Sequence, residues 1–331
     1  MGECKIHFLN VLNGDCTIIE HETGRISVID ICNGNAQNTN NLSMEANFNN
    51  QRNPTNPISY LENICKGNEI FRFILTHPDM DHMDGIKNLF ENFTIYNFWD
   101  TNHEKDLSGA DFQRYSKDDW EFYKQIRRKQ EKPKVLQVYQ GYQQDFYRLG
   151  RDNFRIISPS EKLVNELKEE KNPDCWNEIS YVILHSVFNK KILYCGDSGN
   201  KAWENIMNMK DKHLLDEIKD IDILFAPHHG RKTGGDDLNK YLNQLNPKLA
   251  IFGNTGDSKH KNYSAFYNRE IPILTNNEAG DIIATIKESG EIYLIMTRNE
   301  WDDLLEKNKK NENWENKLNK NNIYLNRGIY E

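Results

Sequence analysis

The stretch FILTHPDMDHMDGIKNLF, residues 73–90, places two imidazoles and two carboxylates within six positions, directly after an apolar run. They belong to His77, Asp79, Asp81 and His82. Neighbouring carboxylates repel each other, so a folded chain that crowds them needs a compensating charge. A bound cation is the simplest such charge. Taken alone, Asp79 or Asp81 would be an ordinary cap of the helix that follows.

Two later segments have the same design, in which an apolar strand runs into a loop of ligand-type residues. They are ILYCGDSG, residues 192–199, and LFAPHHG, residues 224–230. Asp197 could be a turn residue between its glycines, and the two histidines could lie at the edge of the core. Three such strand ends in one chain indicate a single site instead, because rigid scaffolds carry catalytic groups on loops at strand ends.

The order of apolar runs and helical periods predicts an α/β protein. Hairpin patterns occur in both halves of the chain, and helical patterns fall between strands. Two sheets, each covered by helices on its outer face, account for this order. Residues 33–57 are Asn-rich and read as an insertion, and residues 104–132 carry charges and aromatics at helical spacing. Residues 301–331 form a charged tail that we expect to be helical.

Charge, cysteine spacing and hydropathy narrow the kinds of protein that the sequence can encode. The formal net charge of -8 gives no bulk attraction to nucleic acid, although bound cations would offset part of it locally. The six cysteines form no C-x-x-C pair, which disfavours a thiolate zinc site and favours a reduced, cytoplasmic protein. The N-terminus has no signal-peptide pattern, and no apolar run approaches membrane-spanning length.

The motif set resembles the metallo-β-lactamase superfamily. His77-x-Asp79-x-Asp81-His82 is similar to its H-x-[HD]-x-D-H signature, followed in the right order by a Gly-Asp and a late histidine. FLNVLNGDC, Asn177 with Ser180, LYCGD and APHHGR resemble the ComEC-like branch, the metallo-domain of competence proteins. The resemblance spans about residues 4–290. It implies an αββα four-layer sandwich of two mixed sheets over residues 1–300, with insertions near 33–57 and 104–132.

The resemblance also implies two divalent metal ions, Zn²⁺ or Mn²⁺, with Mg²⁺ as a further candidate. Its implied ligands are His77 and Asp79 for one ion, Asp81 and His82 for the second, Asp197 as a bridge, and His229 as the last histidine. His228 is the less suitable member of the histidine pair. Asp15 and Asn177 are candidates for auxiliary roles beside the ligands.

Two departures from the family pattern affect the first metal position. The second ligand is Asp79 where many members have histidine, and a harder oxygen ligand shifts preference toward Mn²⁺ or Mg²⁺, although Zn²⁺ also accepts carboxylate. No histidine of the Gly-His-Thr type lies between residue 82 and Asp197, and His185 lies in mid-strand. We therefore expect the first metal position to be poorly filled or labile.

These residues predict a hydrolase that uses a metal-activated water, with Asp81 orienting the water and carrying its proton. The resemblance implies a phosphodiester of DNA or RNA as the leading substrate, with a cyclic or other small nucleotide next, so the prediction is a phosphodiesterase or nuclease. Arg231 and Lys232 could hold a phosphate, or form a solvated basic turn.

Two other functions stay open. The same site could hydrolyse a lactone, thioester or β-lactam, or the chain could be a catalytically weak binding module of the same fold. Residues 116–130 mix aromatic and basic side chains, which suits a nucleic-acid surface but more simply indicates the packed face of an amphipathic helix. The tail could bind a protein partner.

Overall fold

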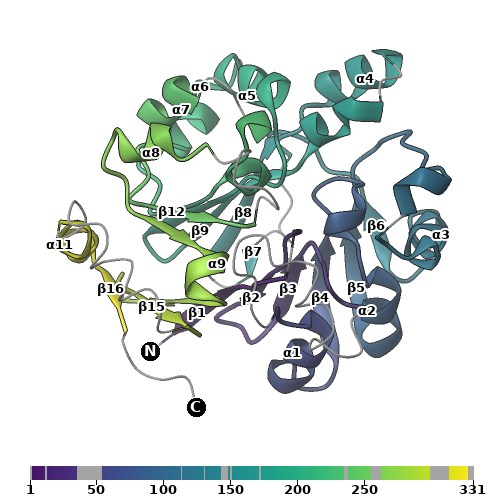
Figure 1. Ribbon diagram of the computed structural model, residues 1–331, viewed down its shortest axis with the longest axis horizontal. Coiled ribbons are helices and arrows are strands. Elements are labelled where there is room, and N and C mark those ends of the chain that lie inside the picture. The colour runs from purple at the N-terminus through teal and green to yellow at the C-terminus, as the bar shows by residue number, and fades with distance from the viewer. Residues whose placement is uncertain are drawn as a thin grey trace.

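The computed structural model describes most of the chain at the level of individual elements. The described residues are 2–11, 13–35, 54–112, 114–129, 131–142, 148–149, 151–170, 173–234, 238–254, 262–298 and 313–326. Two β-sheets lie face to face in this part of the chain, with helices outside them (Figure 1).

The first sheet has nine strands among the described residues, in the order β16-β15-β14-β1-β2-β3-β4-β5-β6. It is mixed, because β1 pairs antiparallel with β2 and β14, whereas β3, β4, β5 and β6 run parallel to one another. The strands are β1 Glu3–Phe8, β2 Thr17–Glu20, β3 Ile26–Ile29, β4 Glu69–Ile74, β5 Thr94–Trp99, β6 Lys134–Leu136, β14 Ile282–Lys287, β15 Ile292–Met296 and β16 Ile323–Leu325.

The second sheet has seven described strands, in the order β13-β12-β11-β10-β9-β8-β7. It is also mixed, with β10 to β13 parallel and β7 to β10 antiparallel. The strands are β7 Arg148–Leu149, β8 Asp152–Ser158, β9 Val182–Val187, β10 Lys190–Tyr194, β11 Ile223–Phe225, β12 Leu249–Phe252 and β13 Ile273–Thr275.

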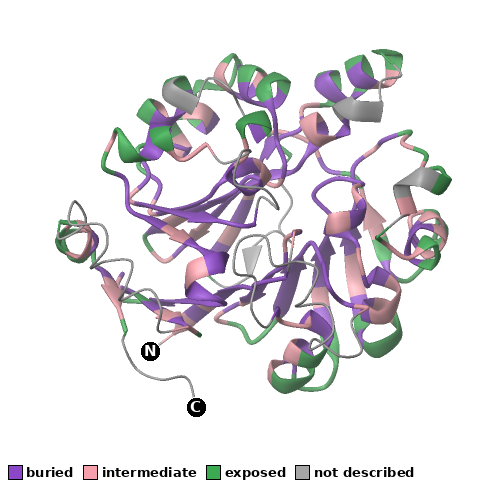
Figure 2. Cartoon of the chain, in the orientation of Figure 1, coloured by how far each residue is buried: buried purple, intermediate pink, exposed green. Residues whose placement is uncertain are grey.

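The main core fills the space between the sheets. Side chains alternate along a strand, so Cys4, Ile6 and Phe8 of β1 point the same way, opposite their partners Ile286, Ala284 and Ile282 on β14. All six belong to the cluster that packs against the second sheet, and the strands are the most buried part of the molecule (Figure 2). Each large apolar side chain buried here contributes about 1.5–3 kcal/mol.

Helices cover the outer face of each sheet. One apolar cluster joins the first sheet to α1 Pro57–Ile64, α2 Ile86–Asn92 and α3 Lys117–Ile126. A second joins the other sheet to α5 Asn200–Met207, α6 Lys212–Glu217, α7 Leu238–Leu245 and α8 Ser264–Tyr267. Figure 1 shows the two helical layers on opposite sides of the sheets. The predicted four-layer α/β sandwich is therefore confirmed.

The predicted insertions and tail add to this frame. Helix α3 lies inside 104–132 and buries Trp120, Tyr123 and Ile126, so its aromatic stripe is a packed face. Within the expected tail, α11 Trp314–Lys320 is helical, but β16 pairs parallel with β15 and extends the first sheet. Residues 36–53, 299–312 and 327–331 lie outside the described part. The tail predicted to bind a partner is therefore described only over residues 313–326, and its binding of a partner stays a prediction.

The remaining elements are short. They are α4 Glu161–Glu170, α9 Asn276–Ala279 and the 3-10 helices Met80–His82 (η2), Gly109–Phe112 (η3), Pro173–Ile179 (η5), Pro227–Gly230 (η6) and Lys232–Gly234 (η7). Among the described helices, none combines the length and apolarity that crossing a bilayer requires. The five described cysteines, Cys4, Cys16, Cys32, Cys65 and Cys195, are buried as free thiols.

Candidate metal centre

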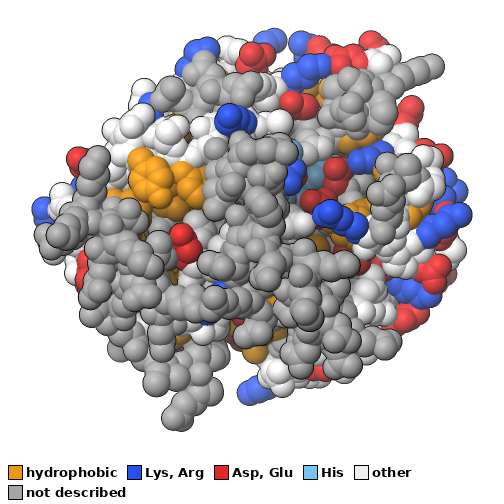
Figure 3. All heavy atoms as spheres, viewed as in Figure 1, with side chains coloured by type: hydrophobic (Ala, Val, Ile, Leu, Met, Phe, Trp, Pro, Cys, Tyr) orange, Lys and Arg blue, Asp and Glu red, His pale blue; other side chains and the backbone are white. Residues whose placement is uncertain are grey.

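The three ligand-type loops of the sequence meet at one end of the sandwich. His77 follows β4 of the first sheet, whereas Asp197 follows β10 and His228 and His229 follow β11 of the second. The parallel pairing of β10 with β11 brings the last two loops to the same sheet edge. Figure 3 shows histidine, acidic and basic atoms gathered together on this face.

Asp197 stands at the centre of the cluster. Among the described residues, four imidazoles turn their Nε2 atoms toward its carboxylate. Oxygen Oδ2 lies 3.8 Å from His77 and 3.4 Å from His228. Oxygen Oδ1 lies 3.3 Å from His82 and 3.5 Å from His229. The two oxygens therefore face two separate pairs of histidines.

One further carboxylate lies beside each pair. Asp79 Oδ1 is 3.8 Å from His77 Nε2, and Asp81 Oδ2 is 4.0 Å from His229 Nε2. Two donor atoms that share a tetrahedral Zn²⁺ stand about 3.4 Å apart, since each lies about 2.1 Å from the ion. The observed separations of 3.3 to 4.0 Å are close to this spacing.

The inner atoms of the cluster lack ordinary hydrogen-bond partners. Nε2 of His77, His82 and His229 and Oδ1 of Asp197 are all buried, and no described residue hydrogen-bonds them. Leaving a buried polar atom unpaired costs about 1–3 kcal/mol, so four together in one place need an explanation. Cations among these atoms supply one, and imidazole and carboxylate are ligands that Zn²⁺ and Mn²⁺ accept.

The outer nitrogen of each ring is hydrogen-bonded instead. The Nδ1 atoms of His82 and His229 lie 2.8 Å from Asp30 Oδ2 and 3.0 Å from Asp15 Oδ1. Thr76 Oγ1 donates to Asp30, so it accepts from Nδ1 of His77 at 3.1 Å. Nδ1 of His228 lies 2.9 Å from Thr233 Oγ1. Partners of this kind orient the rings so that Nε2 faces the cluster, as metal-binding histidines require.

Mutual attraction sets the charges of the cluster. Burial raises the pKa of Asp197, but the imidazoles of His228, His229 and His82 outweigh it and hold that pKa well below its usual range. Burial lowers the pKa of His229, but Asp15 and Asp197 outweigh it and raise that pKa to about 9. Burial and the neighbouring His82 lower the pKa of His77 to about 3. The carboxylate is thus the anion around which the site is built.

A strained turn presents both histidines of APHHGR. His228 and His229 have φ of 49° and 54°, and Gly230 has φ of 82°. Neighbouring side chains on an extended chain point to opposite sides, whereas this left-handed turn directs both rings at Asp197. The His228 N–H donates to the Gly196 carbonyl at 2.9 Å, which ties the turn to the loop that carries Asp197. The sequence predicts that His228 is the less suitable ligand of the pair, whereas its ring faces the Asp197 carboxylate as that of His229 does.

The other predicted residues vary in their position. Asp15 contacts His229, and Gly14 beside it approaches the Asp81 carbonyl so closely that a Cβ would stand 1.8 Å from that oxygen. The Asn177 Nδ2 atom lies 3.5 Å from Asp197 Oδ2. Arg231, one residue beyond the histidine pair, is half-buried and Lys232 is exposed. Their contact with a substrate stays a prediction.

Two charged residues at the site, Asp30 and Lys105, were missed by sequence reasoning. Asp30 directly follows β3 and accepts from the Thr76 N–H and from His82. Lys105 pairs with Asp79 at 2.5 Å. Asp30 had a signal, namely an aspartate at the end of an apolar strand like the other three loops, whereas Lys105 lies among many charges in an insertion and had none.

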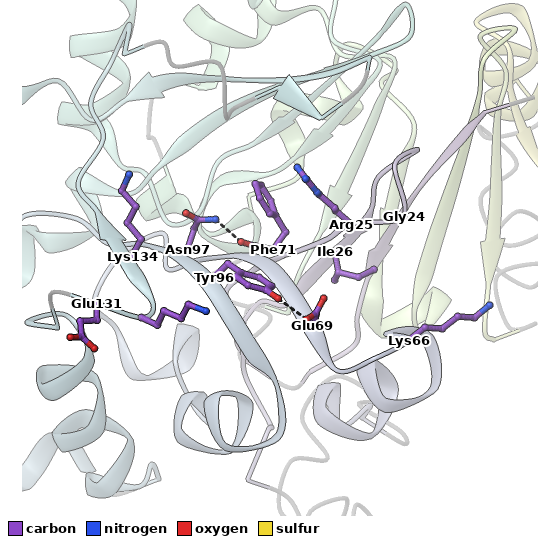
Figure 4. Close-up of a pocket in the computed structure, with 11 residues that line it drawn as sticks. Gly24, Arg25, Ile26, Lys66, Glu69, Phe71, Tyr96, Asn97, Glu131 and Lys134 are labelled. Atoms are coloured by element: carbon purple, nitrogen blue, oxygen red, sulfur yellow. Dashed lines mark hydrogen bonds between the residues drawn. The ribbon is translucent and has the colours of Figure 1, made fainter.

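A separate cavity of about 650 Å³ lies at the other ends of the parallel strands, near Ile26, Glu69 and Lys134, which begin β3, β4 and β6. Its wall includes Phe71, whose ring lies 4.6 Å from the Arg25 guanidinium, and Tyr96. The Tyr96 hydroxyl donates to Glu69 at 2.6 Å (Figure 4). The candidate ligand side chains are at the opposite strand ends, so this cavity is no part of the candidate centre.

No family model matches the sequence, and no curated protein matches it. Several solved structures have a similar arrangement. A putative Zn-dependent hydrolase of the metallo-beta-lactamase superfamily from Thermotoga maritima has a TM-score of 0.37 and 14% identity, over 80% of this chain and 85% of that one.

The metallo-beta-lactamase fold protein YhfI from Bacillus subtilis has a TM-score of 0.41 and 10% identity, over 83% of this chain and 96% of that one. A diphosphatase from the PhnP family has a TM-score of 0.40 and 12% identity, over 82% and 94%. These similarities concern the fold.

Proposed function

We propose that this chain is a metal-dependent hydrolase of the metallo-β-lactamase superfamily that cleaves a phosphodiester. One observation carries the proposal: the two oxygens of buried Asp197 face two separate pairs of imidazoles. A carboxylate with two oxygens can bridge two cations. The motifs of the sequence support the same assignment, and the ComEC-like branch stays a prediction.

The proposed ligand sets follow from the distances. His77, Asp79, His228 and Oδ2 of Asp197 would hold the first ion. Asp81, His82, His229 and Oδ1 of Asp197 would hold the second. Besides the shared Asp197, His228 would be the third side chain at the first position. It would take the place of the histidine that the sequence lacks between residue 82 and Asp197. Mixed nitrogen and oxygen ligands suit Zn²⁺ or Mn²⁺, and Mg²⁺ is less suited to so many imidazoles.

When bound, two divalent cations lower the pKa of a water and neutralise charge that develops on the attacked group. The chain's own residues do the rest. Asp81 has a side chain that is 28% exposed, so one of its oxygens can reach a water at the mouth of the site. It would orient that water and accept its proton. His82 and His77 are fully buried and keep their rings fixed.

A phosphodiester of DNA, RNA or a small nucleotide is the proposed substrate class, because a two-cation clamp holds both the attacking and the leaving oxygen of an in-line displacement. Hydrolysis of a lactone, thioester or β-lactam, and binding without turnover, are the competing functions. The competing functions predict no cleavage of phosphodiesters under any metal.

Elemental analysis of the purified chain, together with a substrate panel, tests the proposal. The panel contains single-stranded DNA, double-stranded DNA, RNA and cyclic nucleotides with added Mn²⁺, Mg²⁺ or Zn²⁺. We expect about two metal equivalents, as in two-metal sites, and a chelator-sensitive phosphodiesterase activity that Asp81→Ala abolishes. Asp222→Ala is the matched control, because Asp222 pairs with Lys190 away from the site. A metal-loaded protein that cleaves none of the panel would reject the proposed substrate class.

A further inference from the structure

Lys105 reaches the candidate centre from the second insertion. Its Nζ atom lies 2.5 Å from Asp79 Oδ1, and its side chain is only 11% exposed. The same oxygen of Asp79 lies 3.8 Å from His77 Nε2. The ammonium therefore stands directly beside the first proposed metal position, at the partly open side of the site.

The loop that carries Lys105 is held by a chain of buried polar groups. The Lys105 backbone N–H donates to Nδ1 of His103 at 3.0 Å. The opposite nitrogen of that ring lies 2.5 Å from the Tyr123 hydroxyl, which itself donates to Asp100 at 2.5 Å. Arg127 pairs with the other oxygen of Asp100 at 2.9 Å. Burial and Arg127 keep the pKa of His103 well below its usual range, so the ring is neutral and donates from Nε2 to Tyr123.

These hydrogen bonds fix the backbone of Lys105 more firmly than is usual for a lysine in a surface ion pair. Ion pairs near the surface contribute about 0–1 kcal/mol and rarely hold a flexible lysine in one geometry. Here Tyr123 lies on α3 and Arg127 is the capping residue at its C-terminal end, so the helix of the insertion fixes the backbone of Lys105 through His103. The insertion thus builds one wall of the site and sets the position of a cation there.

We propose that Lys105 is a substrate-binding residue that receives an anionic oxygen of the substrate, and that it makes the site selective for phosphate-bearing substrates over neutral carbonyl compounds. This inference rests on the proposed function. An ammonium has three N–H donors, and among the described residues only Asp79 accepts one. A phosphate beside the first metal position would accept another, whereas a neutral ester gains little from the charge.

Binding of inorganic phosphate to the metal-loaded protein, measured by calorimetry, tests the inference without turnover. We expect Lys105→Met to weaken phosphate binding about tenfold or more, as loss of a charge-assisted hydrogen bond would, with unchanged metal content. Lys105→Arg keeps the charge and should retain most of the affinity. Lys117→Met removes an exposed lysine of the same insertion and should change nothing. Equal phosphate affinity in Lys105→Met and the unchanged protein, or no phosphate binding at all, would overturn the inference.

A second readout separates substrate binding from a structural role. For bis-p-nitrophenyl phosphate, Lys105→Met should raise KM more than it lowers kcat, while hydrolysis of a neutral p-nitrophenyl ester stays unchanged. Loss of metal, or an equal loss on both substrates, would make Lys105 a positioning residue for Asp79 instead and would overturn the inference. A protein that binds metal and phosphate but cleaves no diester would refute the proposed function alone, because the phosphate titration still decides the role of Lys105.

Discussion

His228 and His229 are adjacent in sequence, yet they face different oxygens of Asp197. In the proposed ligand sets this difference places them at different metal positions. His228 shares Oδ2 with His77, and His229 shares Oδ1 with His82. Each ring would therefore complete one proposed ligand set, and removing either should leave the other set intact.

We expect His228→Ala to lose one metal equivalent and His229→Ala to lose the other, whereas Asp197→Ala loses both because both sets share its carboxylate. Metal content after gel filtration, measured by mass spectrometry of the elements, checks this expectation. His213→Ala is the control, since His213 is an exposed histidine on α6. Full occupancy in His228→Ala would show that this ring is no ligand.

Asp30 hydrogen-bonds the outer nitrogen of a proposed ligand, His82, and substituting it tests whether such partners affect metal affinity. It accepts from the Thr76 N–H and hydroxyl at 2.7 Å each and from His82 Nδ1 at 2.8 Å. Asp30→Asn keeps the shape but removes the anion that orients the ring, so metal affinity should fall about 10–100-fold. Competition with a coloured chelator measures it. Asp222→Asn alters a carboxylate that accepts from the Lys191 N–H and should leave the affinity unchanged. Equal affinities in both variants would exclude this role for Asp30.

Spacing within one segment was readable from the sequence, whereas pairing between segments was not. Asp79, Asp81 and His82 stand out because few folds crowd such groups without a cation. Asp30 and Lys105 lie 52 and 26 positions from their partners His82 and Asp79, and only the sheet and the insertion bring them together. The direction of the His228 ring depended on a left-handed turn that the letters PHHG do not specify.

At the scale of elements, the η6 turn directs the rings of His228 and His229 toward Asp197. Three consecutive residues adopt positive φ there, and a left-handed conformation costs about 1–2 kcal/mol for each residue with a Cβ. Gly230 avoids this cost at its own position. It also leaves room for Phe252, because a Cβ on residue 230 would stand 2.1 Å from the Phe252 ring.

Gly230→Ala should therefore destabilise the fold and disturb metal binding together. Gly67→Ala is a matched control, because Gly67 has φ of 83° against 82° for Gly230 but nothing within 4 Å of an added Cβ. We expect the control to cost about 1–2 kcal/mol from strain alone. Gly230→Ala should cost about 1–3 kcal/mol more, as overpacking does. Urea unfolding measures both, and equal losses would mean that Phe252 moves aside freely.

Elements with strong periodicity were predicted, and those that depend on distant partners were not. The strands before the three loops end in short buried apolar runs, and α3 carries a clear amphipathic stripe. β16 is only the three residues Ile323–Leu325 inside a charged tail. It forms because β15 offers it a parallel edge, and such pairing is set by tertiary contacts rather than by local propensity.

At the scale of the whole molecule, a second polar group lies between the sheets at the end away from the candidate centre. Asp152, which begins β8, lies 2.6 Å from His21 Nδ1 and 3.2 Å from His185 Nε2. His21 also contacts the Ser27 hydroxyl at 2.8 Å, and Arg72 lies near enough to repel a charged His21. Every nitrogen of these two rings has a partner, so the group joins the two sheets by hydrogen bonds.

This group should make stability depend on pH. Burial lowers the pKa of His21 from 6.5 to about 4, although the Asp152 hydrogen bond opposes that shift. Between these two values the unfolded chain binds a proton that the folded chain does not, so stability falls as pH drops from 6.5 toward 4. The full shift corresponds to about 3 kcal/mol. Burial raises the pKa of Asp152, but His185 and His21 outweigh it and hold that pKa at about 2, so its contribution is lost only below pH 3.8.

Chemical unfolding of the chelator-treated protein at pH 7.5 and pH 5 measures the effect without interference from metal release. His21→Gln keeps a donor near Asp152 but cannot titrate, so the variant should lose less stability than the unchanged protein over this interval. At pH 5 the two proteins should differ in their stability loss by about 1–2 kcal/mol. This is less than the full effect of about 3 kcal/mol because pH 5 still lies above the folded-state pKa of His21. His213→Gln removes an exposed histidine and should leave the slope unchanged. Identical slopes for all three proteins would mean that His21 titrates normally in the fold, and that the hydrogen bonds between the sheets do not keep it neutral.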